Sequence, residues 1–287
     1  MLLTASILFM QVKKLGLGTV QFGMPYGISN AQGQTSAEEV RKILLAASGH
    51  GITVLDTASA YGNAETVLGK NDLQKFNIVS KYMTPSTGKS IEQQLQQSFA
   101  HLQVQKLYGY LAHRPAGILS DARQWKTLKD LQQQGLIEKI GFSLNTVEEL
   151  KALLNKGYIP ELVQVPYNYF DNRFENSMIA LKEKGGEIHT RSAFLQGLFF
   201  KDTNTLPAFF DVVKPLIKRV QQQTHNISGA LLHFAAGRSF IDKVIVGVEN
   251  AQQLLINIRD LQLGIDLDNN KTDIPEQILM PSNWPKQ

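Results

Sequence analysis

Four ionisable side chains in the first half of the chain are placed where they could meet at one site. Asp56 ends the apolar segment TVLD and Tyr61 follows after a short loop, while Lys81 lies in NIVSKY and His113 in YLAHRP. Together they supply a carboxylate, a phenol, an ammonium and an imidazole. This set suits the reduction of a carbonyl group, because the carbonyl oxygen must gain a proton when a hydride is added to the carbon.

Each of the four residues has a place in that chemistry. An ammonium near a phenol favours the phenolate and so lowers the pKa of the phenol toward neutral pH. A buried carboxylate holds the ammonium in place. A neutral imidazole donates to the substrate oxygen and orients it. We therefore expect Tyr61 to be the proton donor, with Asp56, Lys81 and His113 in the supporting roles. Singly, each residue also has an ordinary structural explanation, so the prediction depends on their occurring together.

The elements that must position these residues alternate along the chain. Strands are expected at 15–20, 53–58, 77–82, 107–113, 139–143, 162–167, 188–194 and 243–248. Helices are expected at 36–49, 90–103, 122–134, 146–156, 175–185, 208–223, 228–237 and 250–261. Strands that alternate with helices in this way predict an α/β fold, namely a (β/α)8 TIM barrel, in which the strand ends share one mouth. We expect residues 1–287 to form this single domain, with 264–287 as a tail on the barrel surface.

The composition narrows the function classes. The 287 residues are 43% hydrophobic and 19% charged, with a net charge of +4 and no run of five like charges, so a nucleic-acid-binding arm is not expected. The chain has no cysteine, and its other histidines lack close metal-ligand spacing, so we expect no catalytic metal.

The segment 1–14 has the apolar character of a targeting sequence but not its order. Its lysines follow the short apolar stretch and it has no A-x-A cleavage pattern, so we expect a strand or hairpin that closes the barrel rather than a signal peptide. No stretch reaches the ~18 apolar residues that span a membrane. A cytoplasmic location is therefore expected, with no membrane partner.

The chain resembles the aldo-keto reductase family. The segment DTASAYGNAETVLG at 56–69 is similar to the signature of that family and contains Asp56 and Tyr61. Lys81 and His113 match the other two residues of the family's set of four catalytic residues. The resemblance spans about residues 15–260. It implies a (β/α)8 barrel that reduces an aldehyde or ketone to an alcohol with NADPH, or with NADH, and without a metal. The expected partner is a small carbonyl compound, and the expected state is a monomer or weak homo-oligomer.

The resemblance also implies where the cofactor binds. The segment 18–20 resembles the loop near the nicotinamide ribose, Ser143 and Gln164 match residues that hold the carboxamide, and 188–199 resembles the loop around the pyrophosphate. The segment 245–258 resembles the region that binds the adenosine end. The residues expected to contact the cofactor are Gly18, Thr19, Val20, Asp56, Ser143, Gln164, Arg191, Ser192, Phe194, Gln196, Gly197, Val246, Gly247, Gln253 and Asn257.

Three positions depart from the family pattern. Leu144 replaces an Asn that many relatives have, and Arg191 stands where many relatives stack a Tyr on the nicotinamide. At the adenosine end the chain has the acidic Glu249 and no Lys or Arg for the 2′-phosphate of NADPH. This predicts weaker discrimination between NADPH and NADH than in strict NADPH reductases.

The sequence indicates fewer residues that contact the substrate than residues that contact the cofactor. Arg114 follows His113 directly, where many relatives place an aromatic wall, and a guanidinium there would bind a carboxylate or phosphate bidentately. The alternative is that Arg114 points outward or pairs with Asp121. Phe22 and Tyr82 are expected to form apolar walls for the substrate.

Two other functions are compatible with the sequence. One is a nicotinamide-binding regulatory or sensor subunit, since the same fold also serves potassium channels. The other is a barrel isomerase or lyase that needs no nicotinamide. Turnover and titration with NADPH and NADH separate the three.

Overall fold

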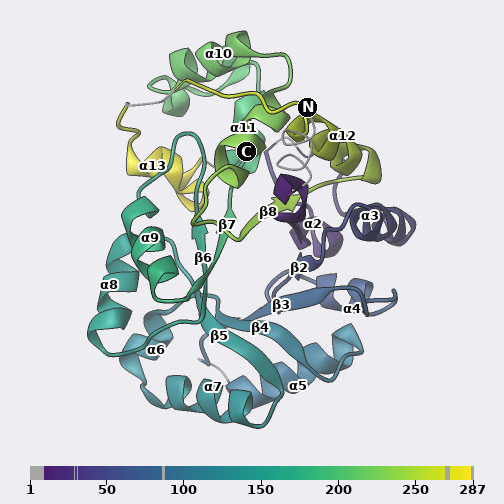
Figure 1. Cartoon of the computed structure of the whole chain (residues 1–287), viewed down its shortest axis with the longest axis vertical. Coiled ribbons are helices and arrows are strands. Elements are labelled where there is room, and N and C mark those ends of the chain that lie inside the picture. The colour runs from purple at the N-terminus through teal and green to yellow at the C-terminus, as the bar shows by residue number, and fades with distance from the viewer. Residues whose placement is uncertain (1–9, 29, 31, 86–87, 269–271, 286–287) are drawn as a thin grey trace.

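The computed structural model describes residues 10–28, 30, 32–85, 88–268 and 272–285. A closed barrel of parallel strands lies at its centre, and each strand pairs with the next in the order of the chain until β8 pairs with β1 (Figure 1). The predicted (β/α)8 fold is therefore confirmed. The strands are β1 (Leu15–Gly18), β2 (Val54–Asp56), β3 (Asn77–Tyr82), β4 (Leu107–Ala112), β5 (Ile137–Ser143), β6 (Leu162–Pro166), β7 (Glu187–Arg191) and β8 (Lys243–Gly247).

The longer helices surround the barrel at the predicted places. They are α3 (Ala37–Gly49), α5 (Ile91–Leu102), α7 (Arg123–Gln133), α8 (Val147–Asn155), α9 (Glu175–Glu183), α10 (Lys214–Gln223), α11 (Ile227–Ala236) and α12 (Ala251–Leu261). Side-chain caps fix the starts of some of them: the Ser36 side chain accepts from the backbone N–H of Glu39, and Ser90 forms a capping box with Gln93. No helix in the described part of the chain is long and apolar enough to cross a membrane.

Two expectations about elements were wrong. The segment 10–13 is helical and is not a barrel-closing strand, while residues 1–9 lie outside the described residues. The helix expected at 208–223 is divided into η3 (Ala208–Phe210) and α10. Short helices that the sequence did not predict are α2 (Val20–Gly23), α4 (Ala64–Leu68), α6 (Ala116–Ser120), η1 (Leu195–Phe200) and η2 (Thr203–Thr205).

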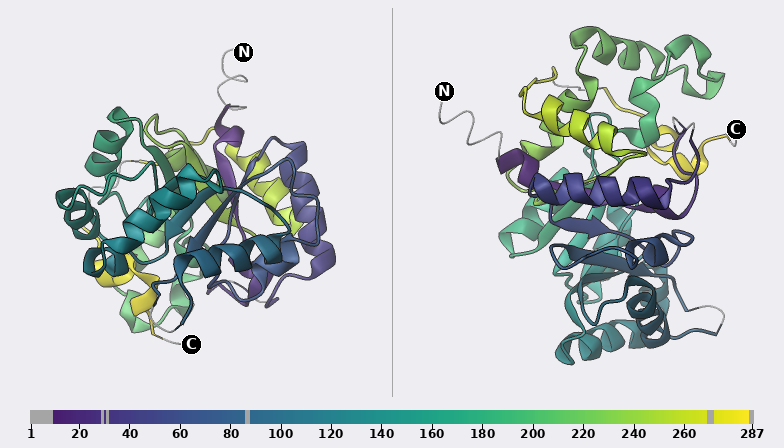
Figure 2. Two further views of the ribbon diagram at one scale, coloured as in Figure 1. Left: turned by 90° about the horizontal axis from the view of Figure 1, so that it is seen from below. Right: turned by 90° about the vertical axis from the view of Figure 1, so that its right-hand side faces the viewer.

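A second apolar cluster lies outside the main core and includes the tail. It joins η1, η3 and α10 to the tail helix α13 (Glu276–Leu279) and to Trp284, which follows η4 (Pro281–Asn283). Ile278 is fully buried in this cluster, and the indole N–H of Trp284 donates to the Ile278 carbonyl at 2.9 Å. The described part of the tail thus lies against the barrel (Figure 2).

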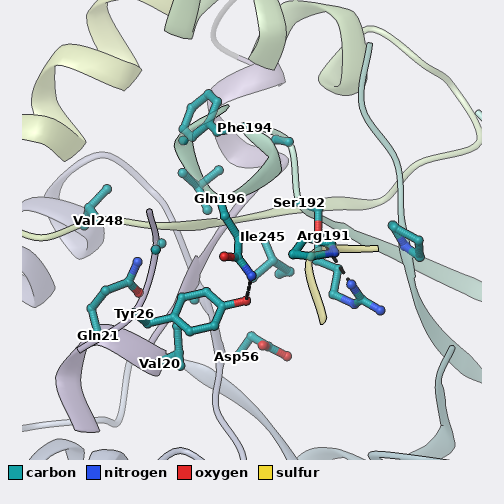
Figure 3. Close-up of a pocket in the computed structure, with 18 of the residues that line it drawn as sticks. Val20, Gln21, Tyr26, Asp56, Arg191, Ser192, Phe194, Gln196, Ile245 and Val248 are labelled. Carbon is teal, nitrogen blue, oxygen red and sulfur yellow. Dashed lines mark hydrogen bonds between the residues drawn. The ribbon is translucent and has the colours of Figure 1, made fainter. Parts of the chain in front are cut away.

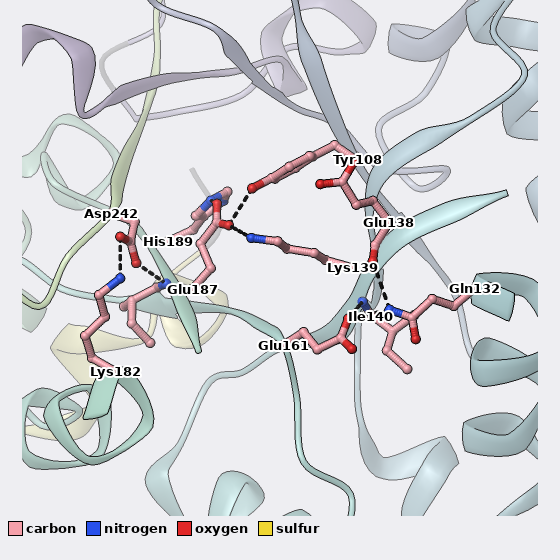
Figure 4. A network of polar contacts seen from close by, with 11 residues as sticks. Tyr108, Gln132, Glu138, Lys139, Ile140, Glu161, Lys182, Glu187, His189 and Asp242 are labelled. Carbon is pink, nitrogen blue, oxygen red and sulfur yellow. Dashed lines mark hydrogen bonds and ion pairs between the residues drawn. The ribbon is translucent and has the colours of Figure 1, made fainter. Parts of the chain in front are cut away.

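The amino ends of the strands carry a network of charged side chains (Figure 4). Glu187 at the start of β7 accepts hydrogen bonds from the Tyr108 hydroxyl at 2.5 Å and from the Lys139 ammonium, and its other oxygen lies 2.7 Å from His189 Nε2. His189 is fully buried. Burial alone would raise the pKa of the Glu187 carboxyl, but His189, Lys139 and Tyr108 outweigh it and lower that pKa to about 2.

Glu187→Gln should lower the free energy of unfolding at pH 7 by roughly 3 kcal/mol, because a pKa unit is worth about 1.4 kcal/mol. Since the folded pKa is depressed below its usual 4.5, the stabilisation is present above pH 4.5 and is lost as the pH falls toward 2. Urea unfolding at several pH values measures both effects. Glu138→Gln is the control, because Glu138 is half exposed and its ion pair with Lys106 is long, at 3.5 Å. Equal stability of Glu187→Gln and wild type at pH 7 would contradict the prediction.

Candidate active site

The carboxyl ends of the strands open into a cavity of about 860 Å³, which is within the usual range for small-molecule sites (Figure 3). The ends of six strands contribute Gly18, Asp56, Ser143, Gln164, Arg191 and Gly247 to its lining. Strand register places several of these side by side: Ser143 pairs with Gln164, and Gly18 pairs with Gly247. The tail residues 279–282 also line the cavity, as do Ser228 of α11 and Gln253 of α12.

Lys81 is the centre of the polar cluster at the base of this cavity. Its ammonium donates to both Asp56 oxygens, at 2.8 and 2.7 Å, and to the Thr57 carbonyl at 2.9 Å, and it lies 3.4 Å from the Tyr61 hydroxyl oxygen. Gln164 Nε2 donates to Asp56 Oδ1 at 2.6 Å. The buried carboxylate is therefore bonded from two sides, by β3 and by β6.

The opposite charges of Lys81 and Asp56 stabilise each other in this buried cluster. Lys81 is fully buried and Asp56 is 3% exposed. Burial alone would lower the pKa of the Lys81 ammonium, but the attraction of Asp56 and of the Tyr61 oxygen outweighs it, so that pKa is raised. The ammonium therefore stays charged beside Tyr61.

Tyr61 lies in the loop after β2, and a glycine pair fixes that loop. Gly62 has φ +58°, and a Cβ there would come within 2.3 Å of the Gly23 carbonyl oxygen. A Cβ on Gly23 would in turn meet the Tyr61 carbonyl oxygen at 1.7 Å. Only glycine allows the Tyr61 loop to lie against α2 in this way.

Glu65, which belongs to the 56–69 segment, contacts the strand that carries Lys81. It is 4% exposed and accepts a hydrogen bond from the Ser80 hydroxyl at 2.6 Å. Because Ser80 precedes Lys81 on β3, this bond fixes the strand that carries the ammonium. Sequence reasoning had assigned no role to Glu65.

His113 faces Tyr61 at the end of β4. The two rings meet edge to face with their centroids 5.7 Å apart. Burial lowers the pKa of His113 to about 3, with help from the charges of Lys81, Arg191 and Arg114, so the imidazole is neutral. Its buried Nδ1 has no hydrogen-bond partner among the described residues. A buried acceptor without a partner is more common than a buried donor without one, which favours a proton on Nε2.

Most residues expected to contact the cofactor line this cavity. They are Gly18, Val20, Asp56, Ser143, Gln164, Arg191, Ser192, Phe194, Gln196, Gly197, Val246, Gly247, Gln253 and Asn257. Thr19 is the exception: it is fully buried, and its hydroxyl donates to the Asp56 carbonyl at 3.0 Å.

Two of the three residues expected to contact the substrate are placed elsewhere. Phe22 is fully buried in the main core, and Tyr82 is 1% exposed and packs on Tyr110. Neither lines the cavity, whereas Arg114 does. The reason for Tyr82 is strand alternation: Lys81 points into the barrel, so the next side chain on β3 points outward to the helices.

Two departures from the family pattern are in direct contact. Arg191 Nη2 donates to the Leu144 carbonyl at 2.9 Å and to Asn145 Oδ1 at 2.6 Å. These bonds join the end of β7 to the loop after β5 and hold the guanidinium at the cavity wall (Figure 3).

The loop after β7 is strained and lines the cavity. Ser192, Leu195 and Gln196 have positive φ values of 66°, 45° and 52°, which cost of order 1–3 kcal/mol each and typically mark functional sites. Gln196 Nε2 donates to the Tyr26 hydroxyl at 2.9 Å, so the loops after β1 and β7 are in contact (Figure 3). This contact joins residues far apart in the sequence, and no local pattern predicts it.

Known proteins of one family resemble this chain. The profile described as "Aldo/keto reductase family" matches residues 14–272. Aldo-keto reductase YhdN from Bacillus subtilis is 26% identical over 186 residues, which is 59% of this chain and 54% of that protein. An uncharacterised oxidoreductase from Mycobacterium tuberculosis is 30% identical over 142 residues, 46% of this chain and 42% of that one.

Solved structures share the fold. An aldo-keto reductase from Bacillus halodurans in its holo form has a TM-score of 0.70 at 20% identity, over 93% of this chain and 90% of that one. An aldo-keto reductase from Klebsiella pneumoniae in complex with NADPH has a TM-score of 0.66 at 22% identity, over 89% and 87%.

The barrel and its polar cluster define a (β/α)8 protein with a cavity at the carboxyl ends of its strands. The chain belongs to the aldo/keto reductase family. It spans about half the length of the curated relatives that it matches.

Proposed function

We propose that the protein reduces an aldehyde or ketone to an alcohol with NADPH or NADH, with Tyr61 as the general acid. The observation that carries this proposal is the contact of the Tyr61 hydroxyl with a buried, charge-balanced Lys81 at 3.4 Å, beside a neutral His113. Membership of the aldo/keto reductase family supports it.

The residues around the cavity fit a dinucleotide. Gly18 and Gly247 form part of the lining, where a Cβ on Gly247 would come within 2.7 Å of the Gln21 side chain. Ser143 and Gln164 lie together and would hold the nicotinamide carboxamide, with the Gln164 NH2 group also bonded to Asp56. When bound, the reduced nicotinamide supplies the hydride.

The protein's own residues handle the proton and the substrate oxygen. His113 donates its Nε2–H to that oxygen and orients it, and the Tyr61 hydroxyl transfers the proton. The Lys81 ammonium stabilises the negative oxygen that is left on Tyr61. Asp56, fixed by Gln164, keeps the ammonium aimed at Tyr61.

Purified protein should oxidise NADPH or NADH only when an aldehyde is added, with the alcohol as the product. The nicotinamide absorbance and product chromatography measure this. Tight cofactor binding without turnover over a broad aldehyde panel would support a sensor subunit instead, and absence of cofactor binding would overturn the proposal.

The dissociation constants of NADPH and NADH should lie within about 100-fold of each other, because one charge-assisted contact is worth about 1.5–3 kcal/mol. Of the described residues that line the cavity, the basic ones are Arg114, Arg173 and Arg191. The lining residues on α12 and on the loop before it are neutral, except for the acidic Glu249. Fluorescence titration measures both constants. A preference of several thousand-fold for either cofactor would contradict the prediction.

Glu249→Lys sharpens this test. Glu249 is one of the residues that line the cavity, so a lysine there should favour NADPH relative to NADH by about 10-fold or more. Glu183→Lys is the matched control, because Glu183 is exposed on α9 and does not line the cavity. If both variants shift the ratio equally, the effect comes from net charge and not from the site.

A further inference from the structure

We propose that the natural substrate carries an anionic group, a carboxylate or a phosphate, close to its carbonyl, and that Arg114 binds this group with Arg191 beside it. This inference rests on the proposed function and names the substrate class of the same site.

Arg114 brings a positive charge to the cavity. It is exposed, lines the cavity and directly follows His113. Among the described residues, none forms an ion pair or hydrogen bond with its guanidinium. Asp121, the alternative partner that the sequence offered, is instead held by Arg123 at 2.8 Å.

Arg191 adds a second charge that no carboxylate neutralises within the described part of the chain. Its hydrogen bonds go to a carbonyl, an amide oxygen and the Ser192 hydroxyl, all of which are uncharged. The third arginine of the cavity differs, since Arg173 is paired with the buried Asp171 at 2.9 Å and with Glu276 at 3.2 Å. Within the described lining, Arg114 and Arg191 are therefore cations without a counter-ion, and they lie at or shortly after the ends of β4 and β7.

Both arginines line the same cavity as His113. Burial is the main cause that lowers the pKa of His113, and the positive charges of Lys81, Arg191 and Arg114 add to it. The pyrophosphate of a dinucleotide is separated from the nicotinamide ring by a ribose, so it does not explain a cation next to His113. A substrate anion beside the carbonyl would meet Arg114 in this position, and the planar guanidinium matches carboxylate and phosphate oxygens.

The experiment compares pairs of aldehydes that differ in charge. One pair is 4-carboxybenzaldehyde and benzaldehyde, and the other is glyceraldehyde 3-phosphate and glyceraldehyde, so the two arms distinguish a carboxylate from a phosphate. We expect wild type to prefer the anion in kcat/KM by at least ~10-fold in one pair. Arg114→Gln should reduce that preference by about 10- to 100-fold, the value of one charge-assisted contact. Arg114→Lys should keep part of it, because charge remains but the bidentate fork is lost.

Arg123→Gln is the matched control. It removes the same charge from a side chain that is 89% exposed and does not line the cavity, so the preference should not change. A wild-type preference below ~2-fold in both pairs, or an equal preference in wild type and Arg114→Gln, would overturn the inference.

A binding measurement separates this inference from the proposed function. Calorimetric titration of wild type and of Arg114→Gln measures the dissociation constants of benzoate and of inorganic phosphate. Benzamide is the uncharged comparison for benzoate, and injection of water is the blank for phosphate. If no aldehyde is reduced, the proposed function fails. The inference about Arg114 then stands only if benzoate or phosphate binds to wild type at least ~10-fold more tightly than to Arg114→Gln.

Discussion

Tyr61→Phe should lower kcat by at least ~100-fold, the usual contribution of a general acid, while the dissociation constant of the cofactor stays within about 2-fold of wild type. The phenyl ring keeps its edge contact with His113, so the cavity should be preserved. What is lost is the hydroxyl that lies 3.4 Å from Lys81. With no donor at that position, the developing negative charge on the substrate oxygen must be met by His113 alone.

Steady-state kinetics on one aldehyde, together with fluorescence titration of the cofactor, test this expectation. Tyr158→Phe is the control, because Tyr158 packs on Trp125 and does not line the cavity. A Tyr61→Phe variant with kcat within ~5-fold of wild type would mean that another group is the acid. A parallel loss of cofactor binding would mean that the substitution disturbed the site and would point away from acid catalysis.

Most of the barrel could be predicted because its pattern is local. Each strand is a short apolar run next to a helix with regular apolar spacing, and capping residues such as Ser36 mark where helices begin. Once the chain is taken as a parallel barrel, topology brings the strand ends to one mouth. Asp56, Lys81 and His113 follow from that rule, although they lie far apart in the sequence.

The rest depends on contacts that no local pattern encodes. Gln164 was expected beside the nicotinamide, yet its amide also bonds to Asp56, which is 108 residues away. The Tyr26–Gln196 contact and the cavity lining from the tail depend likewise on loops that meet only after folding. Tyr82 is a different case: strand alternation, applied to Lys81, was sufficient to place it outside the barrel.

Lys81→Met should damage both the stability of the fold and the activity. It removes the ammonium that satisfies both oxygens of Asp56 and leaves a nearly buried carboxylate with the Gln164 amide as its remaining side-chain donor. Breaking a buried pair from one side typically costs about 3–5 kcal/mol. We expect urea unfolding to show a loss of that size, and kcat to fall at least ~100-fold, since Tyr61 loses its positive neighbour.

The double variant Asp56→Asn/Lys81→Met separates stability from catalysis. It removes both charges, so the uncompensated carboxylate is gone and at least ~2 kcal/mol of the lost stability should return, because replacing both partners of a buried pair is far less costly than removing one. Activity should not return with it, since no ammonium stands beside Tyr61 in either variant. If the double variant is as unstable as Lys81→Met, the damage comes from lost packing of the lysine chain and not from the charge on Asp56. If it recovers both stability and turnover, Lys81 has a structural role only, and Tyr61 must act without an ammonium beside it.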